Sequence, residues 1–186
     1  GMRTSEIRDP NLSSEVKGES FDDSIRTFGS YTDLIIMRHQ AANCAERAAW
    51  LLNTFSHRPV AVLNGGSGAD QHPTQAILDI YTLQKSFESV NGLDGKTILM
   101  CGDLKRGRTV RSLSYLLKNF SNMKVIYAAP EAFQMNQDIL HFLKNHNIEY
   151  KIETQSLARV LPEADAIYMT RIQDEHDKVM GESGRV

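Results

Sequence analysis

The sequence predicts a parallel α/β fold. Short apolar runs of strand type recur along the chain, and stretches with helical spacing lie between them. The apolar runs are continuous rather than alternating, which is typical of strands that are covered on both faces. Strand alternating with helix at this spacing indicates sheets of parallel strands.

The individual elements follow from these patterns. Strands are predicted at residues 34–37, 60–63, 97–101, 125–128, 148–152 and 166–169, the fifth of them more weakly than the others. Helices are predicted at residues 44–55, from Pro73 onwards, around residues 110–120 and around residues 139–143. Residues 1–33 are polar, and we expect them to be turn-like.

The segment from Ser86 to Gly95 is polar, holds two glycines and precedes a fresh strand, so it predicts a domain boundary. We therefore expect one domain over residues 1–87 and a second over residues 88–186. Neither half has enough elements to complete a lobe. We expect the first lobe to be incomplete and the second to lack its C-terminal elements.

Composition excludes several classes of function. Lys and Arg (21) nearly balance Asp and Glu (23), and the formal charge of −2 gives no case for nucleic acid or a membrane surface as a partner. No apolar run reaches the length of a membrane span. The two cysteines, Cys44 and Cys101, lie in apolar segments and are expected to be reduced thiols of a cytoplasmic protein. No metal-ligand spacing, phosphate loop, dinucleotide fingerprint or nucleophile elbow is present.

Polar side chains follow the strands, at the edge where ligands bind in open α/β sheets. Arg38 follows the first predicted strand, His72 the second, Arg108 the third and Arg171 the sixth. Cationic and amide groups at one sheet edge suit an anionic small molecule that carries a carbonyl group. Taken singly, each residue has a plainer explanation as a surface charge or a local cap.

His72 stands at the start of a predicted helix, just past the glycine-rich turn "GGSG". Pro73 at the first helical position fixes the local backbone. Gln75 lies one turn further along on the same helix face, so His72 and Gln75 can address one ligand.

Five motifs in order resemble aspartate carbamoyltransferase catalytic chains, within the aspartate/ornithine carbamoyltransferase family. They are "KGES" (17–20), "MRH" (37–39), "QHPTQAILDIYT" (71–82), "GDLKRGRTVRSL" (102–113) and "YMTRIQ" (168–173). The match runs in register from about residue 13 to about residue 177. The resemblance implies two parallel-sheet lobes of that fold, and transfer of a carbamoyl group from carbamoyl phosphate to L-aspartate in pyrimidine biosynthesis.

The resemblance also implies roles for carbamoyl phosphate binding. Arg38 and His72 would be the catalytic groups, directed at the carbonyl oxygen, with Arg38 also reaching the phosphate. Gln75 would accept from the carbamoyl amide. Ser13 and Lys17 would bind phosphate in the site of a neighbouring subunit, since family members are homotrimers with shared sites.

For the second substrate, the resemblance implies that Arg108 and Arg171 hold the two carboxylates of aspartate and that Gln173 orients it. No metal and no organic cofactor is implied.

The chain departs from the family pattern in several places. The phosphate-cradling Ser-Thr-Arg-Thr segment is absent, and Arg3 to Ser5 only echo it. Glu15 and Val16 replace a common Gly-Lys, and the His-Pro-Leu-Pro loop is missing. Two alternatives therefore stay open: a non-catalytic paralogue or fragment that serves as a binding or assembly partner, and a related transferase that uses another amino acid.

Overall fold

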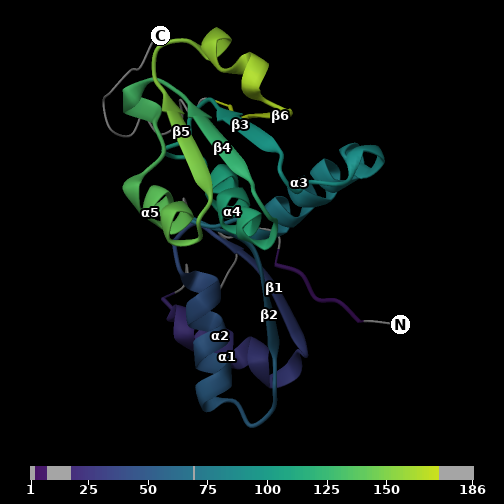
Figure 1. The fold of residues 1–186 in the computed structure, drawn as a ribbon. Helices are drawn as coiled ribbons and strands as arrows, with labels where there is room; N and C mark the ends of the chain where they lie inside the picture. Colours follow the sequence, from purple (N-terminus) through teal and green to yellow (C-terminus); the bar gives the residue numbers. More distant parts are fainter. Residues whose placement is uncertain (1–2, 8–17, 69, 172–186) are drawn as a thin grey trace. The chain divides into compact units, whose positions relative to one another are not determined.

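The computed structural model describes residues 3–7, 18–68 and 70–171 (Figure 1). The chain divides into two compact units, Gly1–Gly68 and Ala69–Val186. Each unit has its own parallel sheet and its own hydrophobic core, so the predicted α/β class is confirmed.

The first unit contains α1 (Phe21–Tyr31), β1 (Leu34–His39), α2 (Cys44–Phe55) and β2 (Ala61–Ser67). β1 and β2 pair in parallel, with Leu34 opposite Ala61. The core between helices and sheet consists of Ile25, Ala48, Leu51, Leu52 and Val60.

Helix α1 corrects the expectation that residues 1–33 are turn-like. Ser20 caps it by accepting a hydrogen bond from the Asp23 backbone N–H at 3.2 Å, and acidic side chains in the first turn suit the helix dipole. Gly29 lies against Leu52 of α2, and a Cβ at Gly29 would overlap that side chain. The helix therefore forms because it is capped and because it packs closely on α2.

The sheet of the first unit is covered on one face by described elements. α1 and α2 pack against the side that carries Ile35, Met37 and Val62. On the opposite side Ile36 is 69% exposed and Leu63 is 47% exposed. The expectation of strands covered on both faces is thus wrong for the described part of this sheet taken by itself, because no described helix of the first unit lies over the second face.

The second unit contains α3 (Pro73–Ser86), β3 (Thr97–Cys101), α4 (Arg108–Leu116), β4 (Lys124–Ala128), α5 (Gln137–Asn145), β5 (Glu149–Glu153) and β6 (Ala166–Met169). Short 3-10 turns lie at Glu88–Val90, Leu117–Asn119, Glu131–Phe133, Leu157–Arg159 and Leu161–Glu163. The strand order is β5-β4-β3-β6, all parallel. All six predicted strands and the four predicted helices are therefore confirmed.

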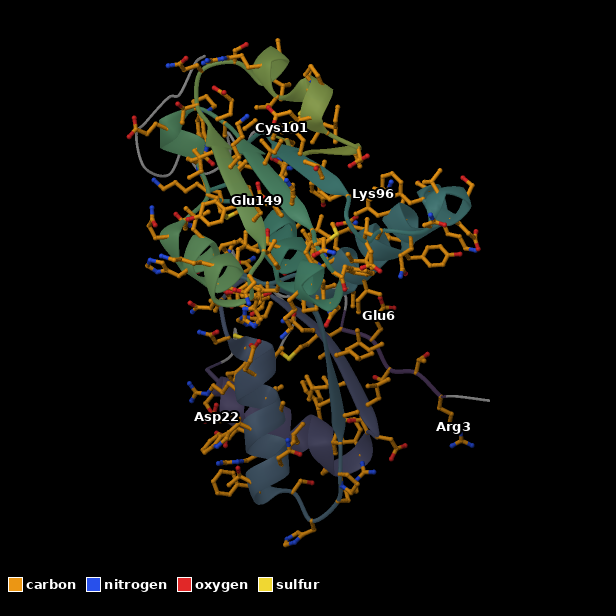
Figure 2. The ribbon with its side chains drawn as sticks, in the orientation of Figure 1. Arg3, Glu6, Asp22, Lys96, Cys101 and Glu149 are labelled. Atoms are coloured by element: carbon orange, nitrogen blue, oxygen red, sulfur yellow. The ribbon has the colours of Figure 1, made fainter. Side chains whose placement is uncertain are left out.

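The two central strands of this sheet, β3 and β4, are buried on both faces, as their continuous apolar sequences predict. Helices α3, α4 and α5 pack in the core on one face. The other face buries Leu99, Cys101, Ile126, Ala128 and Val160. Cys101 lies at the end of β3 (Figure 2), and burial raises the pKa of its thiol. Cys44 and Cys101 are both free thiols, as expected.

Helix α3 packs on α4 within the second unit: Ala76 is fully buried in the core shared with Val110 and Leu113. Along the chain, the division between the compact units falls between residues 68 and 69. The boundary expected between residues 87 and 88 stays a prediction.

Gly102 permits a close approach of β3 to the end of β6. Its φ is +106°, and a Cβ there would overlap the carbonyl and the hydroxyl of Thr170. The Thr170 backbone N–H donates to the Cys101 carbonyl at 2.8 Å. Only glycine satisfies both the backbone conformation and this contact, which lies one residue before Arg171.

We expect Gly102→Ala to destabilise the chain more than Gly92→Ala does. Gly92 also has a positive φ, of +79°, but a Cβ there would meet nothing within 4 Å. Gly92→Ala should cost about 1 kcal/mol through backbone strain alone. Gly102→Ala should cost roughly 2 kcal/mol more, because it adds an overlap. Urea denaturation of both variants measures the difference, and equal losses would contradict the proposed role of Thr170.

Candidate functional site

In the first unit, Arg38 lies at the carboxyl end of β1 with its side chain exposed. Strand pairing is irregular between Met37 and His39, at the same place. Gly65 of β2 lies close to this part of β1: a Cβ at Gly65 would lie 3.3 Å from the Met37 carbonyl oxygen. Among the described residues, no ion pair to the Arg38 guanidinium is found.

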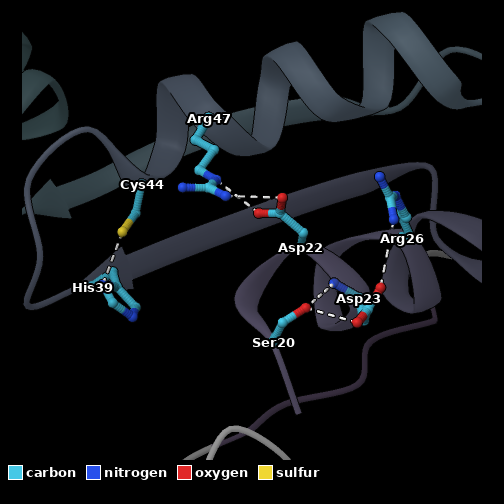
Figure 3. A network of polar contacts seen from close by, with 7 residues as sticks. All are labelled: Ser20, Asp22, Asp23, Arg26, His39, Cys44 and Arg47. Carbon is cyan, nitrogen blue, oxygen red and sulfur yellow. Dashed lines mark hydrogen bonds and ion pairs between the residues drawn. The ribbon is translucent and has the colours of Figure 1, made fainter.

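The loop that follows Arg38 is held by His39 (Figure 3). His39 Nδ1 accepts from the Ala41 backbone N–H at 3.0 Å and lies 3.0 Å from Cys44 Sγ. Because Nδ1 accepts the Ala41 bond, the Cys44 thiol is the donor in the second contact. These contacts fix the turn between β1 and α2.

A fork of two hydrogen bonds joins α1 to α2 (Figure 3). Arg47 Nε and Nη2 donate to the two carboxylate oxygens of Asp22 at 2.7 and 2.9 Å. The hydrogen bonds from Arg47 lower the pKa of Asp22. A cleft of about 460 Å³ lies beside this pair and is lined by Glu19, Phe21, His39, Cys44 and Arg47, among others.

In the second unit, His72 is the residue that precedes the first turn of α3, and Pro73 begins the helix as predicted. The His72 backbone N–H donates to Ser112 Oγ at 2.9 Å. Ser112 Oγ in turn donates to Gln71 Oε1 at 2.8 Å. Helix α4 thus fixes the backbone that carries the His72 imidazole.

Gln75 is connected to β6 through a carboxylate. Gln75 Nε2 donates to Asp79 Oδ1 at 2.9 Å, and the Tyr168 hydroxyl donates to Asp79 Oδ2 at 2.8 Å. Thr109 of α4 also hydrogen-bonds the Tyr168 hydroxyl. Burial raises the pKa of Tyr168 to about 12, so its phenol is protonated and donates at neutral pH. The chain of contacts joins α3, α4 and β6.

The two predicted aspartate clamps follow neighbouring strands. Arg108 is the first residue of α4, after the loop from β3, and Arg171 follows β6. β3 and β6 pair in parallel with Cys101 opposite Met169, so their carboxyl ends lie at one edge. Gly107 precedes Arg108, and a Cβ there would crowd the Asp103 carbonyl, so glycine is required at this turn.

The structure therefore places His72, Gln75, Arg108 and Arg171 in one unit, with α3, α4 and β6 hydrogen-bonded to one another, and Arg38 in the other. The predicted site residues Ser13, Lys17 and Gln173 lie outside the described residues.

Sequence reasoning missed the supporting residues Ser112 and Asp79. Asp79 follows Gln75 by four positions, and a Gln and an Asp at this spacing share a helix face. That signal was present in the sequence. Ser112 lies 40 positions from its partner His72, and no local pattern reveals such a contact.

Arg111 of α4 supports the turn that precedes His72. Its guanidinium donates to both oxygens of Asp138, at 3.1 and 2.5 Å, and lies 4.0 Å from Asp70. The hydrogen bond from Arg111 lowers the pKa of Asp138, and the same bond raises the pKa of Arg111.

Two family models match successive parts of the chain. Residues 1–85 match the family model "Aspartate/ornithine carbamoyltransferase, carbamoyl-P binding domain", and residues 94–183 match "Aspartate/ornithine carbamoyltransferase, Asp/Orn binding domain". Across the described helices, none is long and apolar enough to cross a membrane.

The chain spans about half the length of the relatives that it matches. It is 42% identical over 164 residues to the chloroplastic aspartate carbamoyltransferase of Arabidopsis thaliana, covering 88% of this chain and 40% of that one. It is 42% identical over 165 residues to the aspartate carbamoyltransferase catalytic subunit of Vibrio campbellii, covering 89% and 50%. The aspartate transcarbamoylase of Trypanosoma cruzi, solved with N-(phosphonacetyl)-L-aspartic acid, superposes with a TM-score of 0.77 at 35% identity, over 96% of this chain and 55% of that one.

We expect Ser112→Ala to loosen the turn at His72, and Ser114→Ala to leave it unchanged. Ser114 is a matched control two residues along α4, where its hydroxyl lies 2.7 Å from the buried Tyr127 hydroxyl. Each substitution should cost about 1 kcal/mol for a lost hydrogen bond. Amide hydrogen exchange at His72 should accelerate in Ser112→Ala alone. Equal exchange in both variants would show that Ser112 does not hold the turn.

We expect Asp138→Asn to remove an acid-sensitive part of the stability. The pKa of Asp138 is lowered below 3.8 in the folded state, so the pair stabilises fully above about pH 4, and this is lost as the pH falls through the lowered pKa. The Asp138 side chain is 52% exposed, so the loss at pH 7 should be no more than about 1 kcal/mol. Urea midpoints of the two proteins should differ at pH 7 and converge once the pH falls below the lowered pKa of Asp138. A constant difference at every pH would contradict the ionic contribution.

Proposed function

Because this chain belongs to the aspartate/ornithine carbamoyltransferase family, we propose that the full-length protein transfers the carbamoyl group of carbamoyl phosphate to L-aspartate. The products are N-carbamoyl-L-aspartate and phosphate. The observation that carries the proposal is the hydrogen-bonded link between the start of α3, which bears His72 and Gln75, and the elements that bear Arg108 and Arg171.

The reaction needs stabilisation of charge rather than a protein nucleophile. The aspartate amine attacks the carbonyl carbon, negative charge grows on the carbonyl oxygen, and phosphate leaves. Arg38 and His72 are the donors that we assign to this oxygen, with Arg38 also contacting phosphate. Donors held in position before the reaction lower the barrier, because they need not reorganise during it. The departing phosphate can take the proton of the amine.

Two arginines match the second substrate. Arg108 and Arg171 come from the ends of adjacent strands, and each guanidinium presents parallel donors to a carboxylate. A dicarboxylate such as aspartate needs both arginines, one for each carboxylate. Ornithine would place an ammonium group against a guanidinium, and like charges brought together disfavour it.

Similar structures support this choice of ligands. The Trypanosoma cruzi enzyme was solved with carbamoyl phosphate, and also with aspartate and phosphate. By the same likeness we assign residues 1–87 to carbamoyl phosphate binding and residues 88–186 to aspartate binding. We also assign Gln173 to aspartate, Ser13 and Lys17 to the phosphate of a neighbouring subunit in a homotrimer, and the protein to the cytoplasm.

In the full-length protein, Arg171→Gln should raise the KM for aspartate roughly 10- to 100-fold, the effect of losing a hydrogen bond to a charged group. The dissociation constant for carbamoyl phosphate should stay within about twofold. Arg159→Gln is the control, because Arg159 lies on an exposed 3-10 turn, where its guanidinium donates a hydrogen bond to Gln155. Initial-rate kinetics and calorimetry provide the two measurements.

Equal weakening of both substrates by Arg171→Gln would mean that this arginine supports the fold rather than the dicarboxylate. Carbamoylation of ornithine by the unchanged protein, at a rate comparable to that of aspartate, would overturn the proposed function.

A further inference from the structure

The carboxamide of Gln75 has two chemically different ends, and its surroundings distinguish them. Gln75 Nε2 lies 2.9 Å from Asp79 Oδ1. An ionised carboxylate only accepts hydrogen bonds, so the amide end that faces Asp79 must be the NH₂ group. The acceptor Oε1 then points away from Asp79. Among the described residues no hydrogen bond to Oε1 is recorded.

Asp79 is itself held in place. Its second oxygen, Oδ2, accepts from the Tyr168 hydroxyl at 2.8 Å, and this contact joins residues 89 positions apart. Thr109 hydrogen-bonds the same hydroxyl from α4. Both carboxylate oxygens of Asp79 are therefore engaged, and the side chain is half-buried. Rotating Asp79 away from Gln75 would break two hydrogen bonds, so the carboxylate is a fixed reference for the amide.

We propose that Asp79 is a positioning residue that locks the Gln75 carboxamide with Oε1 toward the ligand, and so makes the site select acyl phosphates that carry an NH₂ group on the carbonyl carbon. The inference rests on the proposed function, since it assigns Gln75 to the carbamoyl group. A carbamoyl NH₂ donates to Oε1. A methyl group in the same place, as in acetyl phosphate, has no hydrogen to donate.

The opposite orientation of the amide would abolish this discrimination. If the Gln75 carboxamide turned over, its NH₂ would meet the NH₂ of the carbamoyl group, and two donors would face each other. Acetyl phosphate would not experience that conflict. Specificity in such a site comes as much from the arrangement that is excluded as from the contact that is made.

The test compares Asp79→Asn with Tyr168→Phe in the full-length protein. Asparagine at position 79 can present either its oxygen or its NH₂, so the Gln75 amide is no longer held in one orientation. Tyr168→Phe removes the hydroxyl that supports Asp79 but keeps the carboxylate against Gln75. Calorimetry with carbamoyl phosphate and with acetyl phosphate gives the selectivity ratio of each protein.

In Asp79→Asn we expect carbamoyl phosphate to bind about tenfold more weakly, the effect of one lost hydrogen bond, with acetyl phosphate within about twofold of the unchanged protein. Tyr168→Phe should lower the selectivity ratio less than Asp79→Asn does, because it keeps the carboxylate beside Gln75 and removes only one of its two supports. The KM for aspartate at saturating carbamoyl phosphate should not change in Asp79→Asn. The inference would be overturned if Asp79→Asn bound both acyl phosphates more weakly by the same factor, or bound both as tightly as the unchanged protein does. A purely structural role of Asp79 would leave the ratio of the two affinities unchanged.

A second measurement needs no ligand. In ¹H–¹⁵N spectra, the side-chain NH₂ of Gln75 should exchange with water more slowly in the unchanged protein and in Tyr168→Phe than in Asp79→Asn. Equal exchange in all three proteins would refute the lock by itself. If this NH₂ is protected but the unchanged protein binds neither acyl phosphate, the proposed function fails and the selectivity falls with it, while the Asp79–Gln75 hydrogen bond stands.

Discussion

The parallel pairing of β6 with β3 is the constraint on which the second unit depends. β6 reaches the sheet after a long connection, and contacts at both of its ends set its register. At the start, Asp165 Oδ2 accepts from the Thr97 N–H at 2.8 Å, and at the end the Thr170 N–H donates to Cys101 at 2.8 Å. With this register Tyr168 reaches Asp79 of α3 and Arg171 lies beyond the strand edge. A shift by one residue would turn Tyr168 to the opposite face, so the site would lose its support at once.

The strands could be predicted because a buried strand is a short run of apolar residues, which is visible in the sequence of the strand itself. Continuous apolar runs such as residues 97–101 predicted strands covered on both faces, and β3 and β4 are covered in this way. The same pattern was misleading for β1, where Ile36 is exposed, because coverage of the second face depends on other elements and not on the strand itself. Helix α1 was missed because its sequence is largely polar. Its capping residue and its contact with Leu52 decide its structure more than its hydrophobicity does.

In the candidate site, too, some residues can be recognised from the local sequence, whereas others depend on contacts between residues far apart in the chain. The residues to which we assign chemistry could be proposed from the sequence, because they follow the ends of strands, where ligands bind in open α/β sheets. The groups that orient them could not be found so readily. Ser112 and Tyr168 act on residues 40 and 89 positions away, and these pairings exist only once α4 and β6 have packed against α3. Asp79 is intermediate, since its spacing from Gln75 is visible in the sequence while its support from Tyr168 is not.

The outward face of α3 has a consequence for how the 186-residue chain behaves as a solute. Ile77, Leu78 and Tyr81 of the second unit are 61%, 55% and 58% exposed, and in the first unit Ile36 and Leu63 are 69% and 47% exposed. Apolar area of this kind draws copies of a molecule together in water. Electrostatic repulsion opposes such association, but a formal charge of −2 on 186 residues supplies little of it. Association through these side chains therefore lowers the concentration at which the isolated chain stays in solution, and salts that strengthen the hydrophobic effect lower that concentration further.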